Sequence, residues 1–146
     1  MSENQSFLFM SNSRIKPIKD MSKNNESLSK VFEKKCQLLL QESKIRFAGI
    51  IDGMGSLVAG GFKEGIEPIK DESTRKRMFL EAAIRVRTRK DFDPDLGPVR
   101  YAASRRDKVV MMTFPISDNH IVFVSTEPDV DIEKLAVKIL GIIGKI

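Results

Sequence analysis

Several residue types are rare or absent in this chain of 146 residues, and their scarcity excludes whole classes of chemistry. There is no tryptophan, and Tyr101, Cys36 and His120 are the only residues of their kinds. A single cysteine excludes an intramolecular disulfide. One cysteine and one histidine also argue against a zinc site within one chain, because zinc favours these two ligands. The sequence therefore predicts neither a metal nor another cofactor.

Long hydrophobic runs and catalytic patterns are also missing. The longest early apolar run covers residues 7–10, which is far too short for a signal peptide or a membrane span. We therefore expect a cytoplasmic protein. No Ser-His-Asp, Cys-His or paired-carboxylate constellation can be argued at any spacing, so we predict that the protein is not an enzyme.

Two stretches begin like binding motifs and then depart from them. Residues 52–56 read Asp-Gly-Met-Gly-Ser, but no Lys-Ser or Lys-Thr follows and the next segment has a strand pattern. Asp-Gly between two apolar runs instead predicts a hairpin turn. Aspartates at positions 91, 93 and 95 resemble the start of a calcium loop. However, Leu96 stands where glycine is required and Ala102 where glutamate is required, so we interpret these acids as turn residues.

The composition that remains is typical of one folded domain. Hydrophobic residues make up 41% of the chain, and 25 basic against 20 acidic residues give a net charge of +5. Residues 1–26 are rich in Ser, Asn and Lys and are predicted to form a flexible tail, with residues 7–10 as an alternative docking segment. Residues 27–146 form the predicted domain.

Hydrophobic periodicity predicts an α+β fold. Helices are expected at residues 27–43, at 73–90 and from Asp131 or Asp129 to the end of the chain. Strands are expected at residues 45–51, 57–62, 99–104, 108–114 and 120–126. The resulting order is α-β-β-α-β-β-β-α, which predicts a five-stranded antiparallel sheet with the terminal helices on one face and the middle helix on the other. Cys36 lies on the apolar stripe of the first helix and is expected to be a buried, inert thiol. His120 begins the last strand beside a polar loop and is expected at the surface.

The middle helix has two apolar faces. Met78, Phe79, Ala82, Ala83 and Val86 share one face at helical spacing. Leu80 and Ile84 fall roughly opposite and need a second packing partner. Residues 75–90 include seven basic residues and one acid, a net charge of +6, and together with the turn after the third strand they define a basic docking surface. Its predicted members are Arg75, Lys76, Arg77, Arg85, Arg87, Arg89, Arg105 and Arg106.

The order of elements resembles the roadblock and dynein-light-chain family, which belongs with the profilin-like and longin-like folds. The residues that carry the resemblance are the first hairpin (Phe47 to Ala59), Lys108 to Phe114, Ile121 to Ser125 and the closing helix. More narrowly, Gly60 to Gly65 and Tyr101 to Met112 are similar to small archaeal proteins with no assigned activity.

This resemblance implies a non-enzymatic homodimer in which the third strand pairs with its symmetry mate and the middle helices pack together. The matching positions of the implied dimer interface are Val99, Tyr101 and Ala103 on the strand and Leu80, Ile84 and Thr88 on the helix. Members of the family commonly serve as platforms for small Ras-like GTPases or larger assemblies. The leading hypothesis is therefore an adaptor or regulatory module. The alternatives are nucleic-acid binding through the basic helix and the Arg105-Arg106 turn, and the sensing of a small ligand beside the sheet.

Overall fold

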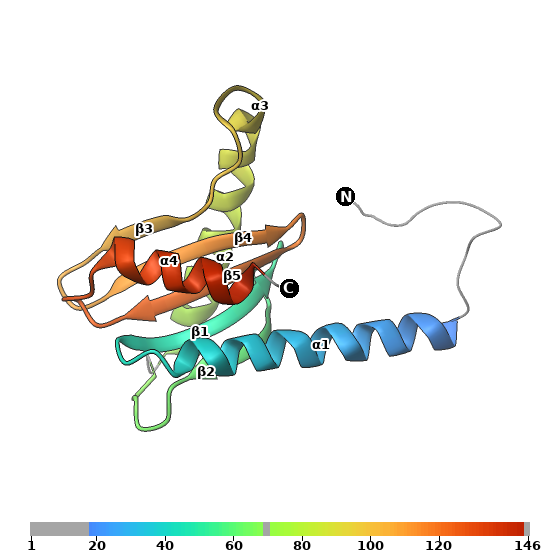
Figure 1. The fold of residues 1–146 in the computed structure, drawn as a ribbon, viewed down its shortest axis with the longest axis horizontal. Helices are drawn as coiled ribbons and strands as arrows, with labels where there is room; N and C mark the ends of the chain where they lie inside the picture. The colour runs from blue at the N-terminus through green and yellow to red at the C-terminus, as the bar shows by residue number, and fades with distance from the viewer. Residues whose placement is uncertain (1–17, 69–70, 145–146) are drawn as a thin grey trace.

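The computed structural model describes residues 18–68 and 71–144, which form one sheet with helices on both of its faces (Figure 1). The first half of the chain contains α1 (Ile18–Leu40), β1 (Ile45–Asp52), β2 (Leu57–Phe62) and α2 (Glu72–Arg89). A short 3-10 helix, η2 (Lys90–Phe92), and α3 (Asp93–Leu96) follow. The second half contains β3 (Ala102–Arg105), β4 (Val110–Ser117), β5 (His120–Thr126) and α4 (Ile132–Ile143).

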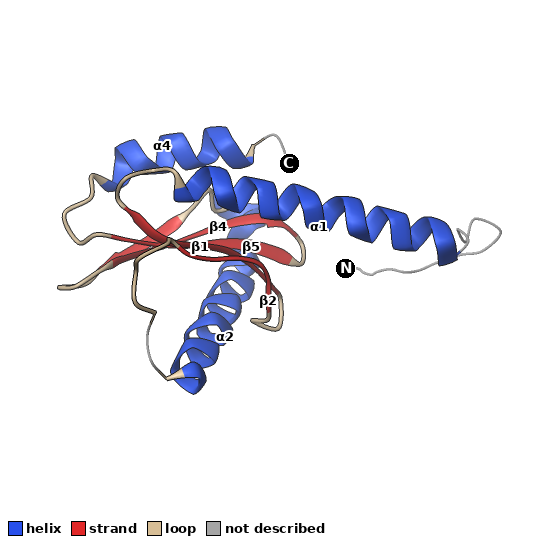
Figure 2. Cartoon of the chain, turned by 90° about the horizontal axis from the view of Figure 1, so that it is seen from below, coloured by secondary structure: helices blue, strands red, loops and turns tan. Residues whose placement is uncertain are grey.

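The five strands lie in the order β2-β1-β5-β4-β3, and each neighbouring pair is antiparallel. Strands β2 and β3 are therefore the edges of the sheet. Helices α1 and α4 lie on one face and α2 lies on the other, as Figure 2 shows. The predicted fold class and the predicted sides of the helices are confirmed.

The larger core lies between the sheet and the pair α1 and α4. It is built on residues that alternate along the strands, because successive side chains of a strand point to opposite faces. On β4, for example, Met112 is fully buried in this core while Met111 points to the α2 face. Members that are fully buried include Cys36, Leu39, Ile50, Met112, Phe114, Val122 and Ile139. Each large apolar side chain buried in this way contributes about 1.5–3 kcal/mol.

The core beneath α2 is smaller. The helix contributes Ala82, Ala83 and Val86, which lie against Phe47 and Phe123 of the sheet. Two of the three buried helical side chains are alanines, and the partly buried Phe79 is the one large helical side chain packed against this core, so less apolar area covers this face of the sheet than covers the other. Helix α2 is consequently held by a narrower stripe than α1 or α4.

The largest differences from the predicted boundaries are in α1, β3 and β4. Helix α1 begins at Ile18, so Ser27, the predicted first residue, lies inside the helix. The predicted tail covers residues 1–26, of which residues 18–26 belong to α1 and residues 1–17 lie outside the described residues. Strand β3 begins only at Ala102, after Gly97 and the ring-constrained Pro98. Strand β4 continues through Pro115 to Ser117, where a shift in register accommodates the proline, which lacks an N–H group for the ladder.

Candidate interaction surface on helix α2 and strand β3

Helix α2 begins where Asp71 caps it. The Asp71 carboxylate accepts hydrogen bonds from the Ser73 backbone N–H (3.0 Å) and from the Thr74 hydroxyl (2.8 Å). The hydroxyl bond, followed by the backbone bond, lowers the pKa of Asp71 below its ordinary value. Arg87 and Arg89 lie in the last turn, where positive charge is favourable beside the carbonyl end of the helix. These contacts fix the helix that was predicted from residue 73 onward.

The turn between β1 and β2 rests directly on the backbone of α2. Asp52 closes this turn by accepting from the N–H groups of Met54 (2.9 Å) and Ser56 (3.0 Å), which confirms the predicted hairpin. Gly55 has φ of 83°, and a Cβ atom placed there would lie 2.7 Å from the Leu80 Cα atom. The hairpin turn and the helix are therefore in backbone contact.

The second apolar face of α2 lies on the flank beside this hairpin. Leu80 and Ile84 are each 42% exposed, and Met54 at the tip of the turn is 75% exposed. Thr88, one helical turn beyond Ile84, is also exposed, and its hydroxyl donates to the Arg85 carbonyl oxygen (3.0 Å). Leu80, Ile84 and Met54 are called the hairpin-side apolar residues below.

The opposite flank of α2 faces the edge strand β3 across a shallow depression of about 180 Å³. Glu81, Arg85 and Arg89 line the helical side of this depression, and Glu81 and Arg85 form an exposed ion pair at 3.5 Å. Because residues advance by about 100° along a helix, this flank lies roughly opposite Leu80. The helical and strand parts of the predicted dimer interface therefore do not form one continuous surface.

The edge strand itself leaves part of its backbone open. The Arg106 N–H donates to the Val109 carbonyl oxygen at 2.8 Å, and Ala103 and Arg105 are opposite Met112 and Val110 of β4. Bonded and non-bonded pairs alternate along an antiparallel ladder. The backbone N–H groups of Ala103 and Arg105 therefore point outward, away from β4.

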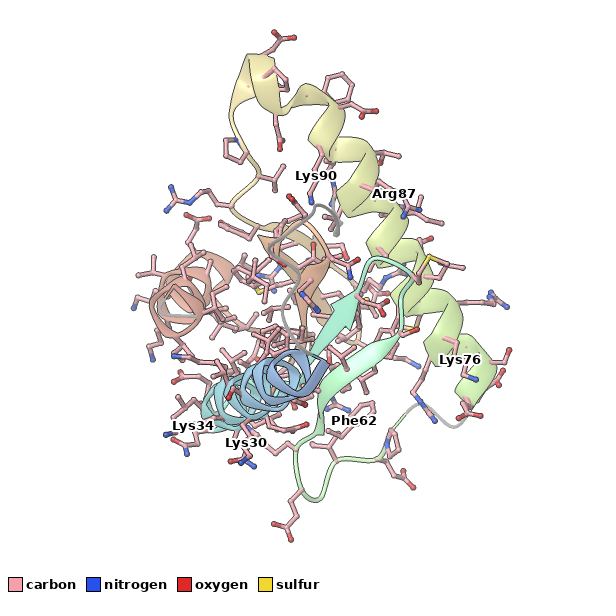
Figure 3. The ribbon with its side chains drawn as sticks, turned by 90° about the vertical axis from the view of Figure 1, so that its right-hand side faces the viewer. Lys30, Lys34, Phe62, Lys76, Arg87 and Lys90 are labelled. Atoms are coloured by element: carbon pink, nitrogen blue, oxygen red, sulfur yellow. The ribbon has the colours of Figure 1, made fainter. Side chains whose placement is uncertain are left out.

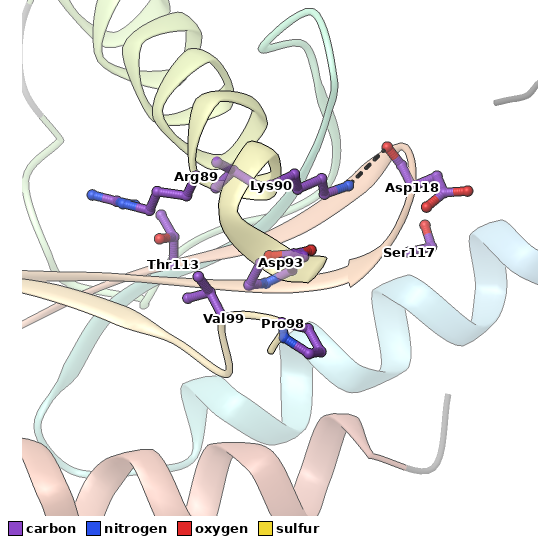
Figure 4. A pocket seen from close by; sticks show the side chains of 10 residues that line it. Arg89, Lys90, Asp93, Pro98, Val99, Thr113, Ser117 and Asp118 are labelled. Atoms are coloured by element: carbon purple, nitrogen blue, oxygen red, sulfur yellow. Dashed lines mark hydrogen bonds between the residues drawn. The ribbon is translucent and has the colours of Figure 1, made fainter. Parts of the chain in front are cut away.

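Tyr101 and Val99, the other two predicted interface positions on this strand, lie in the segment before β3. The Tyr101 ring stacks on Phe114 (5.7 Å between centroids), and its hydroxyl donates to the Glu133 carboxylate. That hydrogen bond is the main reason why the pKa of Tyr101 is raised above its ordinary value. Val99 is half-buried in a cavity of about 210 Å³ below the end of α2, where the Lys90 ammonium donates to the Asp118 carbonyl oxygen at 3.4 Å (Figure 4).

The eight predicted basic residues do not form one surface. Arg105 is directed to the α4 side of the sheet, where its guanidinium donates to the carbonyl oxygens of Pro128 and Val130. Arg87 donates to the Gly53 carbonyl oxygen (3.2 Å) in the hairpin turn. The remaining residues are spread around α2: Lys76 and Arg77 are exposed, Arg85, Arg89 and Arg106 line the depression beside β3, and Arg75 lines a separate cavity. Figure 3 shows Lys76 pointing away from the sheet.

Sequence reasoning missed the contact between Gly55 and α2 and a cavity lined by phenylalanines beneath the first half of that helix. The available signal for the cavity was the concentration of phenylalanines at strand positions that share one face of the sheet. In the part of the chain that the structure describes, no group of three or more His, Cys, Asp or Glu residues has metal-binding geometry. No described helix has the length and hydropathy needed to cross a membrane.

Sequence comparison matches residues 24–146 to a family of unknown function, DUF6659. The chain belongs to DUF6659. Comparison with curated protein sequences finds no significant match.

Solved structures with the same fold give this DUF6659 protein a structural context. Myxococcus xanthus MglB shares 10% identity, with 94% of this chain and 90% of that chain covered and a TM-score of 0.63. A roadblock/LC7 domain from Streptomyces avermitilis shares 13% identity, with 77% and 92% covered and a TM-score of 0.60. Schizosaccharomyces pombe profilin shares 14% identity, with 75% and 90% covered and a TM-score of 0.52. The roadblock-like and profilin-like fold is confirmed.

Proposed function

We propose that the protein is a non-enzymatic, homodimeric adaptor or regulatory module that serves as a platform for a small Ras-like GTPase or a larger assembly. The observation that carries this proposal is the open edge of β3 beside a helix with exposed apolar side chains. The edge strand β3 and the exposed apolar side chains lie on different flanks of α2. This arrangement suits a module that binds a second copy through the strand and a partner through the apolar side chains.

Self-association is assigned to strand β3. Its outward N–H groups at Ala103 and Arg105 can pair with the same groups of a second copy, which would join two sheets into one. An unpaired edge invites uncontrolled aggregation, and pairing across a two-fold axis removes that hazard. One of the solved structures with this fold is described as MglB with a tetrameric arrangement, at 12% identity and a TM-score of 0.55. That arrangement supports the proposal that a protein with this fold can self-associate.

The partner is assigned to the hairpin-side apolar residues Leu80, Ile84 and Met54. They are exposed in the single chain, and Leu80 and Ile84 lie on the flank of α2 that does not face β3. The resemblance to the roadblock family supports a small GTPase as the partner. The nucleic-acid alternative has less support, because Arg105 and Arg87 already donate to carbonyl oxygens and the basic residues are divided among several surfaces.

Light scattering on the full chain tests self-association. The chain has a mass of 16.5 kDa, and we expect twice that mass at tens of micromolar. Ala103→Pro should give a monomer, because proline removes an outward N–H group that none of the described strands of the same chain uses.

Val137→Glu is the control for surface change, since Val137 is 71% exposed on α4, which lies on the face of the sheet opposite α2. It should remain a dimer. A monomeric wild-type protein would contradict the proposal. So would an Ala103→Pro variant that folds normally and keeps the dimer mass.

A further inference from the structure

A cavity of about 300 Å³ lies between the first half of α2 and the sheet, at the end away from α3. It is larger than the depression beside β3 and is lined from four strands and one helix. Its lining is mainly apolar, with charged side chains in addition: Arg46, Phe47, Phe62, Glu67, Arg75, Met78, Phe79, Lys108, Val109, Met111, Phe123 and Ser125. Small-molecule sites are concave, mostly apolar and about 300–1,000 Å³ in volume, so this cavity is at the lower end of that range.

Aromatic rings form the apolar wall. The Phe47 ring lies 4.9 Å from Phe62 and 6.0 Å from Phe123, edge to face in both cases, and stacks on Phe79 at 5.7 Å. Phe79 and Phe123 are a further edge-to-face pair at 5.3 Å. These rings come from β1, β2, α2 and β5, so each is held by a different element. A wall built in this way is fixed before any ligand enters.

The charged side chains that line the cavity are mainly basic. They comprise Arg46, Arg75 and Lys108 against the single acid Glu67. The Arg46 guanidinium is held by Glu127 at 3.0 Å, which fixes its position. Lys108 is exposed and makes no ion pair with any residue that the structure describes. The Lys108 ammonium could therefore bind an anion without first losing an ion pair with a carboxylate of the described residues.

We propose that this cavity binds a small amphipathic anion, with an aromatic or aliphatic body among the phenylalanine rings and a carboxylate beside Lys108. The apolar wall accounts for the body and the basic excess accounts for the charge. No residue of β3 lines this cavity, although Met78, Met111 and Phe123 also border the depression beside that strand. The proposal goes beyond the adaptor function and does not depend on it. Because α2 forms one wall, an occupied cavity would also tighten α2 against the sheet.

Methionine-methyl NMR on the full chain tests the site with phenylbutyrate as the probe. Met78 and Met111 line the cavity, whereas Met112 is buried in the opposite core and Met54 is at the hairpin tip. We expect saturable shifts of the Met78 and Met111 methyl signals, with Met112 and Met54 unchanged. Phenylbutanol, which has a similar body without the charge, should bind more weakly.

Two variants define the chemistry further. Lys108→Gln should weaken phenylbutyrate about two- to fivefold, as expected for an exposed charge pair, and leave phenylbutanol unaffected. Lys134→Gln removes the same charge from an exposed position on α4, and it should change the affinity for neither phenylbutyrate nor phenylbutanol. Ser125→Leu adds an apolar side chain to the cavity lining and should abolish binding of both probes while the Met112 signal keeps its native position.

Three results would overturn the proposal. The first is the absence of a saturable shift at millimolar phenylbutyrate. The second is an equal chemical-shift change at Met112, which would show that the probe binds non-specifically. The third is equal affinity for phenylbutyrate and phenylbutanol in the wild type, which would show that the carboxylate does not contribute to binding.

Discussion

At the scale of single residues, burial decides the chemistry of the two side chains that would otherwise be reactive. Cys36 lies on the side of α1 that faces the sheet and is fully buried. This burial, with a smaller contribution from the charge of Glu33, raises the pKa of its thiol to about 12. The thiolate is the reactive form of cysteine. Cys36 is therefore a packing residue at neutral pH, as its place on the apolar stripe of α1 predicted.

His120 differs from its expected position at the surface. Its ring is half-buried and lies edge to face against Phe32 of α1, 4.9 Å between centroids. The ring nitrogen Nδ1 lies 3.2 Å from the Ser117 hydroxyl oxygen. Loss of solvent lowers the pKa of His120, and the nearby Asp52 carboxylate opposes that shift only in part. The sequence could not show this, because Phe32 is distant along the chain.

His120 should make stability depend on pH in a defined direction. Because its pKa is lower in the folded chain, the unfolded chain takes up protons first as the pH falls below about 6.5. The full stability is therefore present above that pH and declines below it. We expect the melting temperature of the wild type to fall more between pH 7.5 and 5.5 than that of His120→Gln.

Circular dichroism at several pH values in one ionic strength provides the measurement. The comparison isolates His120, because the His120→Gln variant keeps every other titrating group of the wild type. Parallel pH profiles for the two proteins would contradict the assignment.

At the scale of elements, the hairpin between β1 and β2 has a second role as the support of α2. The Asp-Gly pair was enough to predict the turn. It did not predict that Gly55 contacts the backbone at Leu80, because that contact joins segments separated by a loop. Strand β5 and helix α4 were predicted almost to the residue, since each has an unbroken pattern. Strand β3 was misplaced because Val99 and Tyr101 pack like strand residues without belonging to the ladder.

Gly55→Ala should lower the free energy of unfolding by about 2 kcal/mol or more. The new Cβ atom would meet the α2 backbone at 2.7 Å, and the positive φ adds strain of its own. Gly65→Ala is the matched control. Gly65 has φ of 85°, and a Cβ atom there would have no neighbour within 4 Å, so only the backbone cost of about 1 kcal/mol remains.

Urea unfolding of the two variants separates the steric effect from the conformational effect. We expect the midpoint of Gly55→Ala to be the lower of the two. Equal midpoints would show that the hairpin moves away from α2 without cost.

At the scale of the whole molecule, the two faces of the sheet are covered unequally. Helices α1 and α4 bury a continuous core, whereas α2 is attached through three small buried side chains and the partly buried Phe79. Leu80 and Ile84 of α2 remain exposed. The order of elements was enough to predict these layers and the roadblock-like fold. It could not predict the proposed division of this surface between self-association and a partner, because that proposal depends on which flank of the helix faces β3.

This proposed division predicts that partner binding can be lost while the dimer persists. Leu80→Glu with Ile84→Glu should abolish capture of a small GTPase from an extract of the native cells, because charge replaces the apolar contact. The dimer mass should persist. Capture with a GTP analogue and with GDP, followed by mass spectrometry, provides the measurement.

Val137→Glu should capture the GTPase as the wild type does. Capture that ignores the bound nucleotide, or that survives the double substitution, would contradict the assignment of this flank to a GTPase.

Tyr101 gives the molecule a built-in optical reporter. The chain contains no tryptophan, so fluorescence excited in the absorption band of tyrosine comes from this one ring. The ring lies immediately before β3, with its hydroxyl bonded to the Glu133 carboxylate. When a second strand pairs along this edge, any change in that bond alters the emission. The proposed association through β3 can therefore be tested in unlabelled protein, by the emission intensity of Tyr101 as the solution is diluted.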